Sequence, residues 1–385
     1  FAEEALQRLL SMYETIGKVP FRVNSRYGYA IDPIFEGLVQ VATELVASGM
    51  GEPRQVDRLA CEALGLVVGP FTAMNLTGGN PITAKGLARM GSEISPWYKP
   101  PALLDQMVAS GERWDTAKRG ETVDLSAKQR DAVLPLFHGA YLALCGEIID
   151  AGVLSASDLE SGIEIALVID SPQTIFRRLS ADGVEQAMRL AENRWPDLPR
   201  ARCIREWIAS GTAPPPSYVH SRCEGEFAII TIRRPLQLNA LNELVLEQLE
   251  KALNTAQTDP LVRAVVLTGF GTKAFVSGAD IDMLAGLESR EGAEAISRRT
   301  QAAFHAIASG PKPVVALLNG LAFGGGLELA LACTARLAPV GLPLLAAAPE
   351  TNLGIIPGAG GTQRLPRLIG LGPALEMMRT GRVMS

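Results

Sequence analysis

The sequence predicts a multi-domain protein of 385 residues, with a mostly α-helical region up to about residue 208 and an α/β region from about residue 220. In the first half, apolar residues recur at positions i, i+3 and i+4, which is the spacing of one helix face. In the second half, short apolar runs alternate with amphipathic stretches, which is typical of an α/β architecture. Between the halves, three consecutive prolines in residues 211–217 favour an extended linker.

The helical half has its clearest periodic segment at residues 35–49, which end at Gly49. Pro53 suits the first position of the next helix, where its missing N–H would have no acceptor. Residues 35–64 resemble residues 137–167, which predicts a duplicated helical unit, although any two amphipathic helix pairs share such a pattern. The corresponding pairs are Phe35 with Phe137, Gly49 with Gly152, and Asp57 with Glu160.

The second half predicts strands at residues 226–235, 263–271 and 312–320, because each is an apolar run between turn residues. Residues 242–259 between the first two strands predict an amphipathic helix. A glycine cluster follows the third strand, and a further helix is expected to begin near Leu327.

Composition and charge exclude several classes of protein. Hydrophobic residues make up 47% and charged residues 20%, so the chain can bury a core. The net charge of −5 gives no electrostatic reason to bind nucleic acid, and an anionic ligand would need local basic or backbone N–H groups. The five cysteines are scattered without a C-x-x-C pair, and the three histidines are far apart. We therefore expect no metal site, no disulfide framework and a reducing compartment.

No membrane-spanning or export segment is expected. The longest apolar stretch, residues 314–333, is interrupted by Asn319, several glycines and Glu328. The first ten residues are acidic and amphipathic and lack the arrangement of a signal peptide. The expected location is the cytoplasm or, in a eukaryote, an organelle matrix.

Two glycine-containing loops are candidates for binding a ligand through the backbone. They are residues 277–281, Ser-Gly-Ala-Asp-Ile, and residues 323–330, in which three glycines precede a helix. Missing side chains allow close approach, and a helix N-terminus presents free N–H groups. One N–H from each loop could hold a carbonyl oxygen that gains negative charge. A tight structural turn explains a single glycine run equally well.

Glu328 and Glu350 are the candidate acid and base, because both lie in apolar sequence. Burial raises the pKa of a carboxyl group, and a carboxyl that titrates near neutral pH is suited to proton transfer. Either residue alone could instead cap a helix or form a buried ion pair. The two together, next to both glycine loops, favour the catalytic interpretation.

Four segments in order resemble the crotonase superfamily, and above all the enoyl-CoA hydratases and the hydratase parts of bifunctional β-oxidation enzymes. They are NAL (239–241), KAFVSGADI (273–281), KPVVALLNGLAFGGGLELALAC (312–333) and PETNLGIIPGAGGTQRLPRLIG (349–370). The resemblance implies a ββα spiral fold and a coenzyme A thioester as substrate, without a cofactor. The implied reaction is reversible syn hydration of a trans-2-enoyl-CoA to a 3-hydroxyacyl-CoA.

The same resemblance implies roles for individual residues. Glu328 and Glu350 match the two catalytic carboxylates, the backbone N–H groups of Ala279 and Gly325 match the oxyanion hole, and Gly358 matches the residue whose N–H helps to hold the water. Residues that match the coenzyme A-binding positions are Leu238, Ala240, Ala274, Ser277, Gly278, Asp280 and Ile281.

The helical half resembles the C-terminal domain of 3-hydroxyacyl-CoA dehydrogenases at residues 17–38 and 64–79. At the position of that family's Asn before Arg the chain has Asp32-Pro33, which we interpret as a helix N-cap followed by proline at the first helical position. The implied domains are a first helical copy (1–115), a second copy (116–210), a linker (211–219) and a crotonase domain (220–385) that is expected to be truncated at its C-terminus.

The sequence has no G-x-G-x-x-G turn after an N-terminal strand. We therefore expect the chain to be a central fragment that does not bind NAD tightly, with NAD-dependent dehydrogenase activity only in a longer parent. The expected partner is an acyl-CoA substrate, and a homo-oligomer is compatible with the sequence. Two alternatives to the hydratase remain: a Δ3-Δ2 enoyl-CoA isomerase that uses one glutamate, and a non-catalytic acyl-CoA-binding or assembly module.

Overall fold

The structure is a computed structural model that describes residues 2–118, 120–342 and 345–384. Phe1 and Ser385, which bound the predicted domains, lie outside the described residues. The chain forms two compact units, one of residues 21–216 and one of residues 217–385 together with residues 1–20. The sequence assigned residues 1–20 to the first helical copy, whereas in the structure they group with the C-terminal unit.

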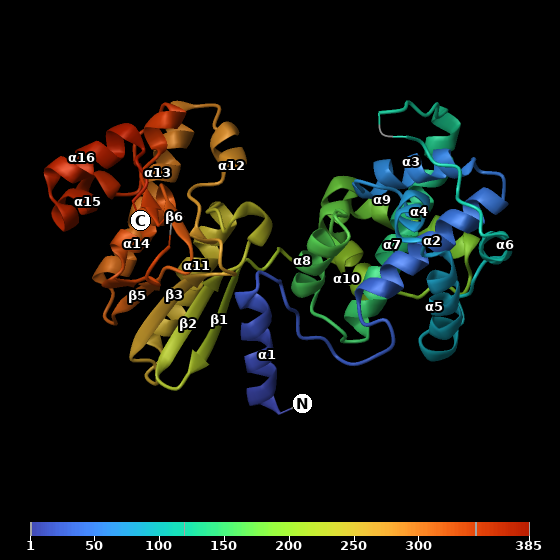
Figure 1. Cartoon of the computed structure of the whole chain (residues 1–385), viewed down its shortest axis with the longest axis horizontal. Helices are drawn as coiled ribbons and strands as arrows, with labels where there is room; N and C mark the ends of the chain where they lie inside the picture. The colour runs from blue at the N-terminus through green and yellow to red at the C-terminus, as the bar shows by residue number, and fades with distance from the viewer. Residues whose placement is uncertain (1, 119, 343–344, 385) are drawn as a thin grey trace. The chain divides into compact units, whose positions relative to one another are not determined.

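The N-terminal unit is helical throughout its described elements (Figure 1). Its helices are α2 (Ile31–Ala47), α3 (Pro53–Leu64), α4 (Pro70–Thr77), α5 (Asn80–Glu93), α6 (Ala102–Ser110), α7 (Ala127–Asp150), α8 (Ala156–Ala166), α9 (Pro172–Arg194) and α10 (Arg202–Ser210). The expected start of α3 is confirmed, since Pro53 is its first residue. A capping box between Glu52 and Gln55 satisfies backbone donors at this helix end.

In each of the two similar helix pairs, a buried acid contacts the N-terminus of the helix that follows the pair. The Asp57 carboxylate in α3 accepts hydrogen bonds from the N–H groups of Phe71 (2.7 Å) and Thr72 (3.1 Å) at the start of α4. The Glu160 carboxylate in α8 accepts one from the Ser171 hydroxyl (2.9 Å), and Ser171 is the N-cap of α9. Each acid thus meets the partially positive N-terminus of the following helix. The division into copies at residues 115 and 116 stays a prediction.

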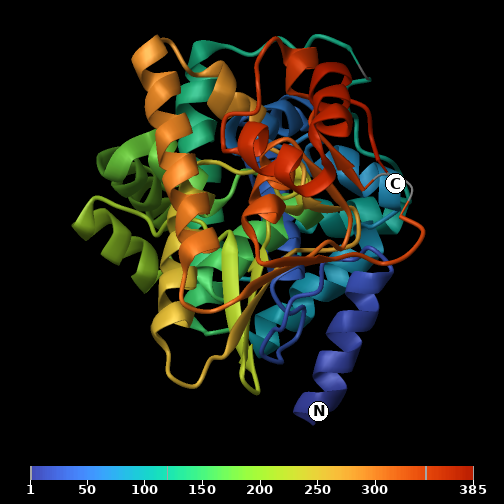
Figure 2. The ribbon, with the colours of Figure 1, turned by 90° about the vertical axis from the view of Figure 1, so that its left-hand side faces the viewer.

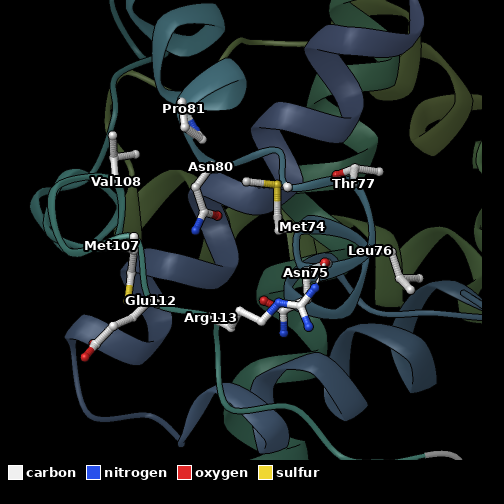
Figure 3. A pocket seen from close by; sticks show the side chains of 12 residues that line it. Met74, Asn75, Leu76, Thr77, Asn80, Pro81, Met107, Val108, Glu112 and Arg113 are labelled. Carbon is white, nitrogen blue, oxygen red and sulfur yellow. Dashed lines mark hydrogen bonds between the residues drawn. The ribbon is translucent and has the colours of Figure 1, made fainter.

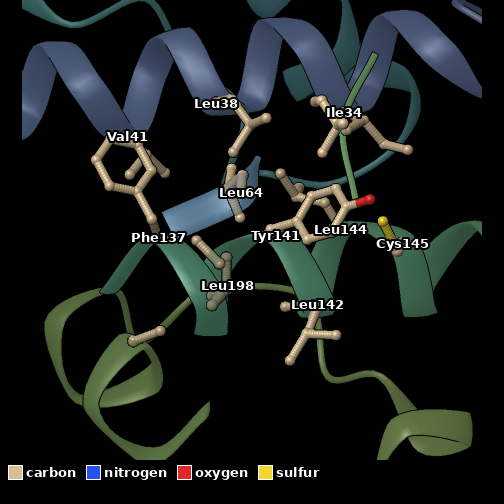
Figure 4. Close-up of a cluster of buried hydrophobic side chains, with 14 of the residues drawn as sticks. Ile34, Leu38, Val41, Leu64, Phe137, Tyr141, Leu142, Leu144, Cys145 and Leu198 are labelled. Atoms are coloured by element: carbon tan, nitrogen blue, oxygen red, sulfur yellow. The ribbon is translucent and has the colours of Figure 1, made fainter. Parts of the chain in front are cut away.

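One hydrophobic core extends across both pairs of helices (Figure 4). Ile34 and Leu38 of α2 face Phe137 and Tyr141 of α7, and all four side chains are at most 2% exposed. The apolar faces that predicted these helices therefore bury each other.

The helix α7 is long and apolar enough to span a membrane. The sequence analysis did not single out this helix. In the structure 72% of its most apolar window is buried among other helices. A core helix of a folded domain passes the same test, so the finding is weak evidence for a membrane.

The C-terminal unit holds two sheets and the helices around them (Figure 1). The first sheet has the order β1-β2-β3-β5-β7, with only β1 antiparallel to its neighbour, and the second is the parallel sheet β4-β6-β8. The strands are β1 (Val219–Glu224), β2 (Phe227–Ile232), β3 (Ala264–Gly269), β4 (Ala274–Val276), β5 (Val314–Leu317), β6 (Leu321–Phe323), β7 (Ala335–Leu337) and β8 (Ala346–Ala347).

Helices of this unit lie between and beside the strands. In Figure 2, α13 is the long orange helix, and α15 and α16 are red. The helical elements are α1 (Glu3–Thr15), the 3-10 helix η1 (Pro235–Gln237), α11 (Glu243–Thr258), α12 (Ile281–Ala285), α13 (Arg290–Ser309), α14 (Gly325–Ala332), the 3-10 helix η2 (Glu350–Leu353), α15 (Gly361–Ile369) and α16 (Leu371–Thr380). The three predicted strands and the helix at 242–259 are present as β2, β3, β5 and α11.

Three sequence expectations need correction. The strand β1 was missed because its polar residues carry no apolar run, and it pairs with β2 through a hairpin. The helix α14 begins at Gly325, not near Leu327, because packing outweighs the low helix propensity of glycine. The interpretation of Asp32 as an N-cap was wrong, since Ala30 is the N-cap of α2. Proline is tolerated throughout a first turn, so Pro33 did not fix the start of that helix.

Candidate active site

Glu328 lies in α14 with its side chain directed to the loop that precedes α15. It is 4% exposed, and its Oε1 accepts hydrogen bonds from the backbone N–H groups of Ala359 (2.8 Å) and Gly361 (2.7 Å). Desolvation by burial raises its pKa to about 7, although the two N–H donors act in the opposite direction. A carboxyl group in this state exchanges a proton readily near neutral pH.

Glu350 begins the 3-10 helix η2 and is 7% exposed. Within the described part of the chain, its Oε2 has no hydrogen-bond partner. Burial raises its pKa, and its charge in turn raises the pKa of Glu328, so the two carboxyl groups lie close enough to interact. A Cβ atom placed on Gly324 would lie 3.2 Å from Glu350 Oε1, which shows that this acid lies against the glycine loop.

The two glycine loops lie side by side. A Cβ atom placed on Gly278 would lie 3.3 Å from Phe323 O, and one placed on Gly325 would lie 3.5 Å from Ala279 N. The first loop is anchored to Leu241, whose N–H donates to Gly278 O (2.8 Å) and whose carbonyl accepts from Asp280 N (2.8 Å).

These bonds use the neighbours of Ala279 and leave its own N–H without an acceptor among the described residues. Gly325 is the first residue of α14, so its N–H has no partner within the helix either. The arrangement can bind one oxygen atom that carries negative charge.

Gly358 lies in the same loop as the donors to Glu328. Its carbonyl accepts hydrogen bonds from Ser297 Oγ (2.7 Å) and Gln301 Nε2 (2.7 Å), both on α13. The side chain of Arg364 donates to the next carbonyl, that of Ala359 (3.0 Å). The loop is therefore tethered by side chains from two helices.

The seven positions matched to coenzyme A binding form one neighbourhood but differ in accessibility. Leu238 and Ile281 are exposed, while Ala240 and Ala274 are buried and could contact a ligand only through the backbone. Ser277, Gly278 and Asp280 lie in the loop beside Leu238, whose carbonyl accepts from Ser277 N (3.1 Å). Asp280 forms an ion pair with Arg234 (2.8 Å) that is almost fully buried.

Arg234 and Asn239 support this neighbourhood, and the sequence analysis gave neither residue a role, although Asn239 begins the NAL segment (239–241). The guanidinium of Arg234 donates to Ala240 O (2.7 Å) as well as pairing with Asp280. Asn239 has a φ of 60° and donates through Nδ2 to Ala274 O (2.9 Å), a backbone conformation that asparagine tolerates better than most residues. The NAL segment was the sequence signal for Asn239, and the position of Arg234 just before Pro235 was the signal for the arginine.

The helical unit has a separate cavity of about 380 Å³ at the ends of α4, α5 and α6 (Figure 3). Two of its polar side chains already have partners: Asn75 accepts from Trp114 N (3.0 Å), and Asn80 accepts from the Trp114 indole (2.9 Å). We assign these contacts to the folding of this unit.

Comparison with known protein families finds one match within each unit. Residues 222–385 match the enoyl-CoA hydratase/isomerase family, and residues 28–121 match the C-terminal domain of 3-hydroxyacyl-CoA dehydrogenase. The hydratase/isomerase domain thus follows a dehydrogenase-type helical domain, which confirms the predicted fold class and the predicted combination.

Three similar proteins illustrate these matches. The crotonyl-CoA hydratase of Syntrophomonas wolfei is 41% identical over 162 residues, which cover 42% of this chain and 61% of that protein. The short-chain-enoyl-CoA hydratase of Clostridium acetobutylicum is 41% identical over 159 residues, 41% of this chain and 60% of that protein. The fatty acid oxidation complex subunit alpha of Idiomarina loihiensis is 40% identical over 156 residues, 40% of this chain and 22% of that protein. The chain therefore spans about three fifths of the length of the hydratases that it matches.

Proposed function

We propose that the hydratase/isomerase domain catalyses the reversible addition of water to a trans-2-enoyl-CoA thioester, as part of fatty-acid β-oxidation. The observation that carries this proposal is the pair of buried, interacting carboxyl groups, Glu328 and Glu350, next to two adjacent loops that present free N–H groups. Hydration needs two carboxyl groups because a proton is removed from water while another is delivered to carbon. It needs the N–H groups because negative charge develops on the thioester oxygen.

The proposed chemistry begins at the thioester carbonyl. The N–H groups of Ala279 and Gly325 would hold its oxygen and stabilise the negative charge that develops there. This polarisation draws electrons from the C2=C3 double bond and makes C3 electrophilic. The oxygen of water then bonds to C3, and the electron pair of the double bond forms an enolate at the thioester.

The surroundings of the two acids support separate roles in proton transfer. Two N–H donors to Glu328 Oε1 favour the ionised form, which is suited to taking the proton of the attacking water. Glu350 Oε2 is buried without a hydrogen-bond partner among the described residues, and burial raises the pKa of Glu350, so this residue is suited to hold a proton and deliver it to C2. The N–H of Gly358 is proposed to help hold the water.

The positions beside the first loop are proposed to bind coenzyme A. The exposure of Leu238 and Ile281 and the position of Ser277 next to the oxyanion N–H groups support this assignment. No resident cofactor or metal is needed for the reaction as derived. We propose the cytoplasm or an organelle matrix as its location, and a homo-oligomer is a further proposal that the sequence allows.

The dehydrogenase-type domain is proposed to serve the oxidation of the 3-hydroxyacyl-CoA product, with NAD as the oxidant in a longer parent protein. The residues described between 21 and 216 do not fit NAD, because their elements are helices without the strand and glycine-rich turn that hold a dinucleotide pyrophosphate. No catalytic step is therefore derived through NAD.

The first prediction tests the two-carboxylate mechanism. Hydration of crotonyl-CoA, followed by the loss of enoyl-thioester absorbance, is expected to fall by about three orders of magnitude or more in Glu328→Gln and in Glu350→Gln, since each removes a proton-transfer group. A Δ3-Δ2 isomerase that uses Glu328 alone would survive Glu350→Gln. Binding of crotonyl-CoA without turnover in the unsubstituted protein would instead favour the non-catalytic module.

A further inference from the structure

The loop that orients Glu328 is held from α13 by two side chains one helical turn apart. Ser297 Oγ and Gln301 Nε2 each donate to Gly358 O at 2.7 Å, and Gln301 also donates to Ser297 Oγ at 3.1 Å. Residues at i and i+4 share one helix face, so both side chains reach the same acceptor. The sequence analysis gave neither residue a role.

The carbonyl that they bind belongs to the same peptide group as a donor to Glu328. The peptide between Gly358 and Ala359 is planar and trans, so its C=O and N–H point in opposite directions. Fixing the oxygen of Gly358 on one side therefore fixes the direction of the Ala359 N–H, which donates to Glu328 Oε1 at 2.8 Å on the other side.

Hydrogen bonding to the carbonyl also strengthens the donor. Donation to a peptide oxygen polarises the group and makes its N–H a better donor, which favours a negatively charged acceptor. The charged side chains that act on Glu328 are Glu350, which raises its pKa, and Arg364 of α15, which lowers it. The peptide N–H adds a directional hydrogen bond to Glu328 that neither of these two charged side chains can replace.

We propose that Ser297 and Gln301 are positioning residues for the catalytic carboxylate Glu328, acting through the Gly358–Ala359 peptide. The inference rests on the proposed hydratase function, because it assigns to these residues the orientation of the base that takes the proton from water. The two side chains act through the peptide and leave the oxyanion N–H groups of Ala279 and Gly325 unchanged.

The test compares kcat, KM and the pH profile of crotonyl-CoA hydration in the intact protein. The variants are Ser297→Ala, Gln301→Ala and the double variant. We expect kcat to fall about tenfold in each single variant and about 100-fold in the double variant, because the base is displaced. KM should change little, since the groups that hold the thioester are retained. The acid limb of the profile should move to higher pH, because ionised Glu328 loses support.

Two matched controls separate positioning from general damage. Arg298→Ala alters the same helix, but that side chain pairs only with Glu294 of its own helix at an exposed position, so kcat and the acid limb should stay unchanged. Ser297→Thr keeps a hydroxyl group and should restore most of the activity lost in Ser297→Ala. Gln301 is exposed, so Gln301→Ala should fold normally even if Ser297→Ala disturbs packing.

The outcomes distinguish this inference from the function on which it rests. If Glu328→Gln retains full turnover, the two-carboxylate mechanism is wrong. If Glu328→Gln abolishes turnover while Gln301→Ala and the double variant behave like Arg298→Ala, the positioning role is wrong and the mechanism stands. A fall in kcat with an unshifted acid limb would also overturn it, since a purely structural role does not change the titration of the base.

Discussion

At the residue scale, two glutamates of one chain have different surroundings and therefore different chemistry. Glu328 and Glu350 are both almost fully buried, and Glu328 accepts two hydrogen bonds from backbone N–H groups, those of Ala359 and Gly361. The donors stabilise the charged form of Glu328, while burial raises the pKa of both carboxyl groups. The proposed division into base and acid rests on these contacts, although both side chains are chemically the same.

The raised pKa of Glu328 predicts a pH dependence of stability. Its pKa is about 7 in the folded protein and 4.5 in the reference state, so between these values the folded protein binds more protons than the unfolded chain. Stability therefore falls as pH rises through this window, by about 3 kcal/mol at most for this group. In Glu328→Gln this contribution should vanish, and the variant should gain stability relative to the unsubstituted protein as pH rises.

Urea unfolding of both proteins, below about pH 4.5 and above about pH 7, measures this difference. The comparison of the two proteins is essential, because burial also raises the pKa of Glu36 and of Glu160 to about 7 and both remain in the variant. Equal dependence on pH in the two proteins would contradict a raised pKa at Glu328.

At the element scale, α14 is positioned by the absence of side chains at its start. A Cβ atom on Gly326 would lie 2.0 Å from the backbone oxygen of Val276 in β4, so only glycine permits this close approach. The close packing of α14 on β4 brings Gly325 next to the loop that contains Ala279. The glycine run is therefore needed for both the packing of the helix and the geometry of the oxyanion site.

Gly326→Ala is expected to destabilise the hydratase/isomerase domain by about 1–3 kcal/mol, since a methyl group would clash with backbone. The matched control is Gly372→Ala in α16, where a Cβ atom would have no neighbour within 4 Å. That control should be neutral or slightly stabilising, because alanine favours helix. Thermal unfolding of the two variants measures the contrast, and similar effects at both positions would refute the packing argument.

At the scale of the whole molecule, each unit has a hydrophobic core of its own. Leu38 belongs to the core of the helical unit and Leu267, in β3, to that of the C-terminal unit. All four tryptophans of the chain, Trp97, Trp114, Trp195 and Trp207, belong to the helical unit. Intrinsic tryptophan fluorescence therefore reports on one unit, while hydration of crotonyl-CoA reports on the other.

Leu38→Ala should lower the stability of the helical unit by about 2–5 kcal/mol and shift the unfolding midpoint seen by tryptophan fluorescence. Leu267→Ala should lower the stability of the C-terminal unit by a similar amount and shift the midpoint at which hydratase activity is lost. Leu38→Ala is expected to change mainly the fluorescence midpoint, and Leu267→Ala mainly the activity midpoint. Equal shifts of both signals by either variant would mean that the two units unfold as a single cooperative body.

The sequence predicted much of the fold because the relevant signals are local. Apolar periodicity located α2 and α11, an apolar run located β3, and Pro53 located the start of α3. These signals failed where a contact with another segment decides the local structure. The polar strand β1 pairs with β2 in a hairpin, and α14 has glycine at position 326 because the helix packs closely against the backbone of Val276.

The residue types at the site were determined by the sequence alone: two glutamates in apolar segments and two glycine loops of the hydratase/isomerase pattern. Only the tertiary structure decided which donors contact Glu328, that Glu350 keeps an unpartnered oxygen, and that Ser297 and Gln301 hold the loop between them. The physical reason is that ionisation depends on burial and on hydrogen bonds from segments more than 30 residues away. Such contacts leave no periodicity in the sequence and exist only in the folded chain.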